Sequence, residues 1–564
     1  MKKYIFVAII LLALLFCVQL NLAMSDSQTT DEGVHLSAGY TYLTKRDFRF
    51  NPEHPPLVKE LAALPLLFLK LNVPNDARYY DKASNFFYDS WRENRQFGEE
   101  LLYGLGNDAA KILLASRIPM ILITIVLGAA VFVISARFWG GKGGIISVAL
   151  FALDPLINGH GHLVTTDVAV SLGFLLSVYC FWLFLNKPIW KNVVLLGLAI
   201  GLAELAKFTA IIILPSFLIL LAMFLIQNKI KFKETGKISG KIIIALAIAF
   251  LVICAGYFFK LKQSPNRSEA ASQVNQLIIA NQDYVFSGFF KNGQFNNTYD
   301  KLRYISAPRE YFKGLAMVVW HTEKGHGSFL LGKTSGLGWW YYFPVLLFLK
   351  TPIPTLVLFL LGIIFALKDK TQFKRNLFFL SAGLLFLLFA MTSKANLGLR
   401  HVMPVLPILF VMSGILGNVK IKYIKYISVA AILWLVAIYL FSYPFYLSYY
   451  NEFAGGTKNG YKIALDSNLD WGQDLLRVRN YITERGINDA FIDYAWDGEL
   501  ALDYYNIPRS ATTVLGDRFR GYAVISATSL QLDIYEWLRD NYKPVDRVIP
   551  SVLVYFVDGE GAQQ

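Results

Sequence analysis

The sequence predicts an α-helical polytopic membrane protein with a small α/β domain at its C-terminal end. The chain has 564 residues, of which 55% are hydrophobic and only 17% are charged. A soluble domain would carry about a quarter charged residues. The apolar residues also gather in blocks close to the roughly 20 residues that cross a hydrocarbon core. This pattern excludes a soluble enzyme and a disordered protein. A disulfide scaffold is excluded as well, because all three cysteines lie inside apolar blocks.

Eleven apolar blocks predict membrane spans. The first also has an alternative interpretation as a cleaved signal peptide, because Lys2 and Lys3 precede its apolar core and small residues follow near Ala23. The predicted spans are 4–24, 116–136, 142–157, 168–186, 192–206, 208–227, 241–260, 343–367, 376–392, 402–418 and 427–446.

The positive charge of the chain follows this topology. Lysine and arginine exceed the acidic residues by 14. With the N-terminus in the cytoplasm, the short cytoplasmic loops hold most of the clustered basic residues, as the positive-inside rule requires. A role in binding nucleic acid therefore loses its main support. The basic loop residues are Arg137, Lys142, Lys187, Lys191, Lys229, Lys231, Lys233, Lys237, Lys241, Lys368, Lys370, Lys374, Arg375, Lys420, Lys422 and Lys425.

Three longer segments are then expected outside the membrane. They are the first outer loop 25–115, the second outer loop 261–342 and the tail 447–564. The tail contains apolar runs typical of short buried strands and a helical pattern over 531–541. We therefore expect two domains, a membrane domain 1–446 and an extracytoplasmic α/β domain 447–564.

The first outer loop carries an acidic cluster just beyond the first span. Asp31, Glu32 and His35 come first, and the proline-rich stretch NPEHPP then supplies Glu53 and His54. Carboxylates beside a membrane can act as a general base or hold a metal ion. The alternative is structural, because Asp31 also suits the N-cap of a following helix.

Further polar residues lie at the expected outer ends of later spans. Arg117 opens the second span, although an arginine there can simply reach toward lipid headgroups. The loop 154–167 contains His160, His162 and Asp167, which suit either a metal site or, for Asp167, a helix cap. Lys207 can pair with Glu204 on one helix face. The remaining candidates are His321, His326, Lys350, Arg400 and His401.

Taken together, these residues predict basic groups that face an acidic loop at the outer leaflet. Such a site suits a phosphate next to a carboxylate that serves as a base. The sequence contains no phosphate-binding loop of the G-x-x-x-x-G-K-[ST] type, no dinucleotide fingerprint and no G-x-S-x-G elbow.

The ordered motifs resemble the GT-C superfamily of polyprenyl-phosphate-sugar glycosyltransferases. The chain is most similar to bacterial relatives of the protein O-mannosyltransferases and of the lipid A aminoarabinose transferases. It thus resembles glycosyltransferase family 39. The resemblance covers the membrane region, and NEFAGG and DSNLDWGQDL in the tail extend it. The membrane-region motifs are Asp31-Glu32, NPEHPPLVK (51–59), Arg117, HGHLVTTD (160–167), AKFTA (206–210) and GLRHVMPVLP (398–407).

The resemblance implies an inverting transfer of a sugar from a polyprenyl-phosphate carrier to an acceptor hydroxyl on a protein, lipid or glycan. It implies Asp31 as the general base, with Glu32 beside it, and donor-phosphate contacts from Arg117 and Lys207. Arg400, His401 and Lys350 are expected near the same phosphate. The other candidates are expected to bind substrate, and they are His35, Glu53, His54, His160, His162, Asp167, His321 and His326.

We expect no cofactor, and a divalent metal ion beside Asp31 and Glu32 is the less favoured alternative. The expected location is the plasma (inner) membrane, with a cytoplasmic N-terminus. An alternative function is a transporter or exporter of a glycan or lipid-linked sugar, in which intramembrane charges form a pathway. A third is a structural or sensory protein with a ligand-binding tail. The stretch Asp466–Asp474 either binds sugar or forms a capped helix start with Trp471 packed against the domain.

Overall fold

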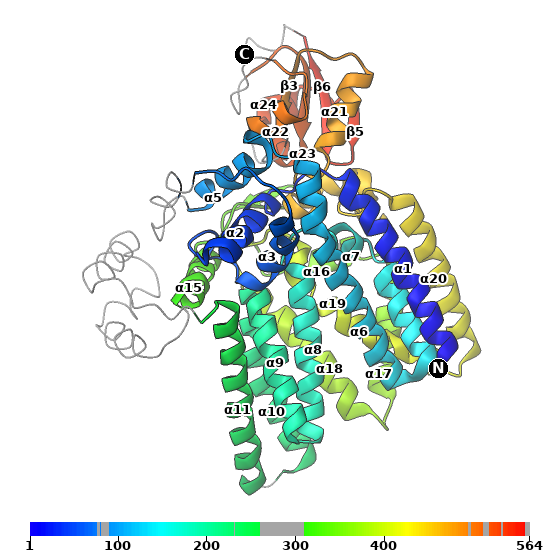
Figure 1. Cartoon of the computed structure of the whole chain (residues 1–564). Helices are drawn as coiled ribbons and strands as arrows, with labels where there is room; N and C mark the ends of the chain where they lie inside the picture. The colour runs from blue at the N-terminus through cyan, green and yellow to red at the C-terminus, as the bar shows by residue number, and fades with distance from the viewer. Residues whose placement is uncertain are drawn as a thin grey trace.

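The computed structural model describes residues 1–75, 79, 90–230, 232–259, 309–494, 498–510, 518–531 and 534–558. It contains a long helical body, a layer of short helices at one end of that body, and a small sheet domain beyond this layer (Figure 1). The predicted class, a helical membrane protein with a C-terminal α/β domain, is confirmed. Residues 261–308 of the predicted second outer loop lie outside the described residues.

The body contains helical structure in each of the eleven predicted spans. Within the described residues, seven helices are long and apolar enough to cross a membrane, or up to eight if one bent pair forms a single span. The chain is therefore a multi-pass membrane protein. The helices of the body are α1 (Lys2–Ser25), α6 (Ala109–Ala152), α8 (Asp167–Asn186), α9 (Trp190–Ala206), α10 (Ile213–Asn228), α11 (Phe232–Gly256), α16 (Tyr342–Lys350), α17 (Ile353–Lys368), α18 (Phe373–Ala390), α19 (Val405–Ser413) and α20 (Lys422–Ser442).

The difference between eleven predicted spans and seven or eight candidate helices has local causes. The second and third predicted spans form one element, α6, in which Gly140 interrupts the helix with a φ of 72°. Glycine adopts this conformation without the steric penalty of a side chain. Helices α16 and α17 meet at a bend of 113°. Helix α9 has only 17 residues, and α19 with the 3₁₀ turn η5 (Gly414–Asn418) is also short.

The outer surface of the body is apolar. Large side chains such as Leu218, Leu433 and Phe441 are 69%, 65% and 90% exposed. Large exposed apolar side chains on helices of this length are typical of a surface that contacts lipid.

The first outer loop, the loop after α6 and part of the second outer loop form a layer that caps the body. Helix α2 begins directly after Asp31 and crosses α3 where Gly39 lies against the backbone of Lys59. A Cβ atom at Gly39 would lie 2.0 Å from the Lys59 carbonyl oxygen, so this crossing requires glycine. The layer comprises α2 (Glu32–Lys45), α3 (Pro56–Ala63), η1 (Leu64–Phe68), α5 (Ser90–Glu99), η2 (Glu100–Gly104), α7 (Pro155–His160) and α15 (Arg309–Lys324), with the hairpin β1 (Ser328–Leu330) and β2 (Lys333–Ser335).

The C-terminal sheet has four strands in the order β3-β4-β6-β5. Strands β3 and β4 are parallel, whereas β6 runs antiparallel to both of its neighbours. The apolar runs of the tail that predict strands, 522–527 and 551–557, form β4 and β6. The elements are α21 (Leu475–Glu484), β3 (Ala490–Asp493), α22 (Glu499–Tyr504), β4 (Gly521–Ser526), α23 (Ala527–Gln531), α24 (Glu536–Asn541), β5 (Asp546–Ile549) and β6 (Val552–Val557).

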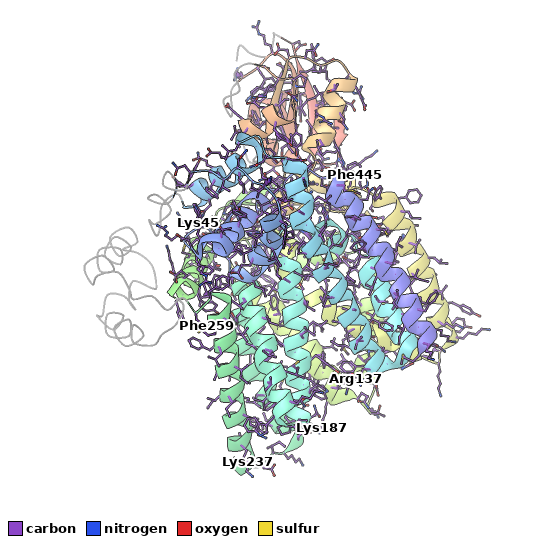
Figure 2. All side chains as sticks on the ribbon, in the orientation of Figure 1. Lys45, Arg137, Lys187, Lys237, Phe259 and Phe445 are labelled. Atoms are coloured by element: carbon purple, nitrogen blue, oxygen red, sulfur yellow. The ribbon has the colours of Figure 1, made fainter. Side chains whose placement is uncertain are left out.

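The chain between α20 and this domain packs on the body and forms the short turns η6 (Glu452–Ala454), η7 (Thr457–Lys462) and η8 (Asp466–Asn468). Figure 2 shows that Arg137, Lys187 and Lys237 lie toward the end of the body away from the sheet domain, while Phe445 lies beside that domain. Basic residues distant in sequence therefore gather on one side of the molecule.

Candidate active site

Four charged side chains from four separate segments meet where the body joins the outer layer. The Asp167 carboxylate lies 2.5 Å from Lys207 Nζ and 3.4 Å from Arg400 Nη1. The same Nη1 atom lies 3.3 Å from the Asp31 carboxylate. We refer to Asp31, Asp167, Lys207 and Arg400 as the charged cluster.

Helix ends place these four side chains together. Asp31 immediately precedes α2, and Asp167 is the first residue of α8, where the helix dipole favours a negative charge. Lys207 lies in the extended break between α9 and the 3₁₀ turn η3 (Phe208–Ile212). Arg400 lies in the 3₁₀ turn η4 (Leu399–Val402) that precedes α19. The cluster is buried except for Asp31, whose side chain is 19% exposed.

The two cations of the charged cluster retain hydrogen-bond capacity. An ammonium has three N–H donors and a guanidinium five. Within the described residues, Lys207 donates only to Asp167, and Arg400 donates through Nε and Nη1 but not through Nη2. Both side chains can therefore bind a further anion.

Arg117 has no such capacity. Its five N–H groups donate to the two oxygens of Glu32 and to the carbonyl oxygens of Ala23, Asp26 and Ser27. Both Arg117 and Glu32 are fully buried. The structure therefore does not bring Arg117 into the charged cluster, where the sequence placed it. Nearby carbonyl groups and Glu32 occupy all of its N–H donors instead.

Glu32 is also fully occupied. Besides the guanidinium, one carboxylate oxygen accepts from the Thr29 N–H at 2.9 Å and the other from the Val164 N–H at 3.0 Å. Burial alone would raise the pKa of Glu32, but the Arg117 charge and these hydrogen bonds hold it below the ordinary value. Glu32 is thus a constantly charged partner, with no lone pair directed toward a substrate.

Lys350 lies apart from the charged cluster as well. Its ammonium donates to the carbonyl oxygens of Leu447, Tyr449 and Asn468, and it lies 4.2 Å from the centre of the Tyr450 ring. These contacts use all three donors. Lys350 therefore fastens the segment after α20 to the end of α16.

Several predicted polar residues line the cluster on the side of the outer layer. The rings of His35 and His54 meet edge to face at 5.0 Å, and His35 Nδ1 lies 2.7 Å from the Val164 carbonyl oxygen. Burial, with the positive charge of Lys207 nearby, holds the pKa of His54 and of His401 well below the ordinary value. Burial and the neighbouring Asp31 charge raise the pKa of Glu53. His54 and His401 are thus neutral at neutral pH and add no positive charge to the site.

The two histidines of HGHLVTTD have different surroundings. His162 Nε2 lies 3.0 Å from Asp26, which in turn pairs with Arg477 at 2.8 Å. His160 is 1% exposed, and among the described residues neither of its ring nitrogens has a hydrogen-bond partner. Burial lowers the pKa of His160 to about 3. Of these two histidines, His160 is therefore the one whose two ring nitrogens are both unpaired among the described residues, and its ring lies 6.0 Å from the Trp471 ring.

His321 and His326 form a pair of their own beside β1. Their rings stack at 5.4 Å with a nitrogen-to-nitrogen distance of 3.2 Å. Within the described parts of the chain, no three His, Cys, Asp or Glu side chains group closely enough to suggest a metal site.

The segment 466–474 contributes contacts that the sequence did not predict. Ser467 Oγ accepts from Arg400 Nε at 3.0 Å, and the Arg400 guanidinium lies 4.0 Å from the centre of the Trp471 ring. The helix start itself is Leu475, after Asp474. Trp471 packs on Leu163, which lies between α7 and α8, and on Leu447, which follows α20. The density of polar residues in this stretch indicated a role, but only the tertiary fold identifies its partner.

Comparison with known proteins gives a family match for part of the chain. Residues 109–255 match a family model described as dolichyl-phosphate-mannose-protein mannosyltransferase. The matched segment contains Arg117, Asp167 and Lys207 but neither Asp31 nor Arg400. Within those residues, the match agrees with the resemblance to the protein O-mannosyltransferases. No curated protein sequence matches the chain.

Two solved structures align with the chain at low sequence identity. ArnT from Cupriavidus metallidurans, crystallised with undecaprenyl phosphate, is 12% identical over 99% of both chains, with a TM-score of 0.47. The Archaeoglobus fulgidus oligosaccharyltransferase, tethered to an acceptor peptide, is 11% identical. That alignment covers 95% of this chain and 72% of the other, with a TM-score of 0.44.

Proposed function

We propose that this protein transfers a sugar from a polyprenyl-phosphate carrier to an acceptor hydroxyl at the outer face of the membrane. The observation that carries the proposal is the charged cluster. Two buried cations with unused N–H donors lie within hydrogen-bonding range of carboxylates, one of which is partly exposed. The family match over 109–255 supports a lipid-phosphate donor.

In this proposal, Lys207 and Arg400 bind the donor phosphate. Negative charge accumulates on the phosphate as the bond between the anomeric carbon and the phosphate oxygen breaks. Cations fixed in a water-poor site stabilise that charge without having to reorganise. Polyprenyl phosphate is then released as the leaving group.

Asp31 is proposed as the general base. The acceptor oxygen attacks the anomeric carbon from the face opposite the phosphate, which inverts its configuration, and the hydroxyl proton passes to the Asp31 carboxylate. Asp31 is the most exposed member of the cluster, so an acceptor from the aqueous side can reach it. Asp167 holds both cations in place while the phosphate is absent.

The contacts of Arg117 and Glu32 support a revised role for this pair. The Arg117 guanidinium binds three carbonyl groups between Ala23 and Ser27, just before Asp31. We therefore assign the pair to holding the catalytic loop rather than to the donor phosphate. Lys350 takes a similar structural role at the other side of the site.

The neutral histidines suit the donor sugar. His54, His160 and His401 each have a buried ring nitrogen that lacks a partner among the described residues. Sugar hydroxyls can satisfy such nitrogens as both donors and acceptors. His35 and Glu53 adjoin this group, whereas His162 is already paired with Asp26. His321 and His326 are proposed to contact the acceptor side.

The proposed reaction uses no metal ion, because two side-chain cations neutralise the charge of the phosphate. Chelation with EDTA is therefore expected to leave transfer unchanged. We further propose that the protein lies in the plasma membrane with its N-terminus in the cytoplasm. The basic residues at the end of the body opposite the sheet domain support this orientation (Figure 2).

The direct test is incubation of purified protein with a panel of polyprenyl-phosphate sugars and candidate protein, lipid and glycan acceptors. Mass spectrometry is expected to detect a sugar-sized mass increase on one acceptor class, together with free polyprenyl phosphate. Movement of the intact lipid-linked sugar across proteoliposome membranes, without any covalent product, would favour a transporter instead.

A further inference from the structure

The segment 466–474 joins the C-terminal domain to the charged cluster through one side chain in particular. Trp471 is 3% exposed, and its ring lies against the Arg400 guanidinium at 4.0 Å. Arg400 also donates its Nε hydrogen to Ser467 Oγ, whose own hydroxyl donates to the Leu397 carbonyl oxygen at 2.9 Å. The guanidinium is thus held on one face by an indole and at one edge by an oriented hydroxyl.

The backbone of the same segment holds the residues that precede Asp31. The Thr30 N–H donates to the Trp471 carbonyl oxygen at 2.9 Å, and the Ser27 N–H donates to the Gln473 carbonyl oxygen at 2.9 Å. Ser27 Oγ donates to the Gly472 carbonyl oxygen at 2.7 Å. Trp471 therefore contacts Arg400 through its ring and anchors the residue before Asp31 through its carbonyl group.

An aromatic partner has a specific consequence for a buried arginine. A carboxylate in this place would use N–H donors and neutralise the charge. An indole face stabilises the cation electrostatically and leaves the N–H groups in the guanidinium plane available. The stack therefore fixes the orientation of Arg400, and its Nη2 hydrogens stay available for another anion.

We propose that Trp471 is a positioning residue for Arg400. The segment 466–474 thereby completes the active site, and the C-terminal domain is required for catalysis. This inference rests on the proposed function, because it takes the donor phosphate as the ligand of Arg400. Ser467 is the second positioning residue, acting on the Nε edge.

The alternative explanation is that Trp471 only fills space between Leu163 and Leu447. Two substitutions separate these roles. W471F retains an aromatic face for the guanidinium, whereas W471L retains an apolar side chain without one. If only packing matters, both variants should behave alike. W537L in α24 is the matched control, because Trp537 belongs to the same domain but packs near Phe519.

The experiment measures donor KM, kcat and thermal unfolding for full-length protein in detergent, together with direct binding of undecaprenyl phosphate. We expect W471L to raise donor KM and to weaken undecaprenyl phosphate binding by at least tenfold. W471F should change either value less than threefold, and W537L should match the wild type. The effects of S467A on donor KM and on undecaprenyl phosphate binding should lie between those of W471F and W471L.

Combination with R400K tests whether Trp471 acts through Arg400. The effect of W471L on binding should shrink to less than threefold in the R400K background, because lysine lacks the planar group that stacks. Equal losses in W471F and W471L, or an undiminished effect of W471L beside R400K, would overturn the positioning role. Failure of the wild type to bind the lipid phosphate or transfer sugar would instead refute the proposed function, and with it this inference.

Discussion

The Glu32 carboxylate and the Arg117 guanidinium face each other through two hydrogen bonds of 2.6 and 2.8 Å, and neither side chain is exposed to solvent. The pair joins the start of α2 to α6. Because every N–H group of Arg117 is occupied, the pair belongs to the framework of the site rather than to its ligand.

Substitution of Arg117 is therefore expected to reduce stability more than donor affinity. R117A leaves a buried, unpaired carboxylate, and removal of one partner from such a pair costs about 3–5 kcal/mol. Thermal unfolding of purified R117A should show a clearly lowered midpoint, which the double substitution E32L/R117M should partly restore. A normal midpoint with a raised donor KM would return Arg117 to the phosphate site.

The same pair predicts a loss of stability in acid. The pKa of Glu32 lies below its ordinary value of 4.5 in the folded protein. A carboxylate with a lowered folded-state pKa contributes stability that is fully present above the unfolded-state value and is lost as the pH falls through the folded-state value. The thermal unfolding midpoint of the wild type should thus decrease as the pH is lowered below about 4.5. E32Q should be less stable at neutral pH and should show a smaller decrease in acid.

Asp31 is predicted to carry the base function. D31N keeps the shape of the side chain but removes its basicity, and loss of a general base typically lowers the rate by about 10²–10⁴-fold. The unfolding midpoint should stay close to that of the wild type, because Asp31 is partly exposed. Turnover near the wild-type level would exclude Asp31 as the base and transfer the role to Asp167, since Glu32 is saturated.

Lys207 and Lys350 provide a matched pair of buried lysines. K207A removes a cation with unused donors and should weaken use of the lipid donor by about 2–4 kcal/mol. K350M removes a lysine whose donors are all taken by carbonyl groups, so its main effect should be a lower unfolding midpoint. Donor KM values and unfolding curves for both variants distinguish the roles. Identical kinetic effects would contradict the separation made from hydrogen-bond capacity.

The fold class could be predicted from the sequence because apolar length and the distribution of lysine and arginine are local signals. The same local signals do not define how the apolar blocks divide into spans. Gly140 interrupts α6 through its backbone conformation, and the bend between α16 and α17 depends on packing. Neither feature changes the apolar pattern enough to be recognised.

For the site as well, local sequence signals identify candidate residues but not their contacts. Asp31, Asp167, Lys207 and Arg400 were all singled out, since charged residues at the ends of apolar blocks are conspicuous. Arg117 and Lys350 were equally conspicuous, and only the three-dimensional structure shows that carbonyl groups and Glu32 consume their donors. The contact of Trp471 with Arg400 joins residues 71 positions apart and has no local signal.

The C-terminal domain is predicted to lie outside the cytoplasm, on the same side of the membrane as Asp31 and the rest of the charged cluster. An inside N-terminus followed by the eleven predicted spans leaves the tail outside, and the lysine-rich loops fix the starting side. Ser510 lies half-buried in the C-terminal domain, where its N–H donates to Ala490. In a background with Cys17, Cys180 and Cys254 replaced by alanine, S510C should react with an impermeant maleimide in intact cells. K237C, at the opposite end of the body, should react only after lysis (Figure 2). The reverse pattern would place Asp31 and the whole charged cluster at the cytoplasmic face, where a carrier facing the outer compartment could not reach it.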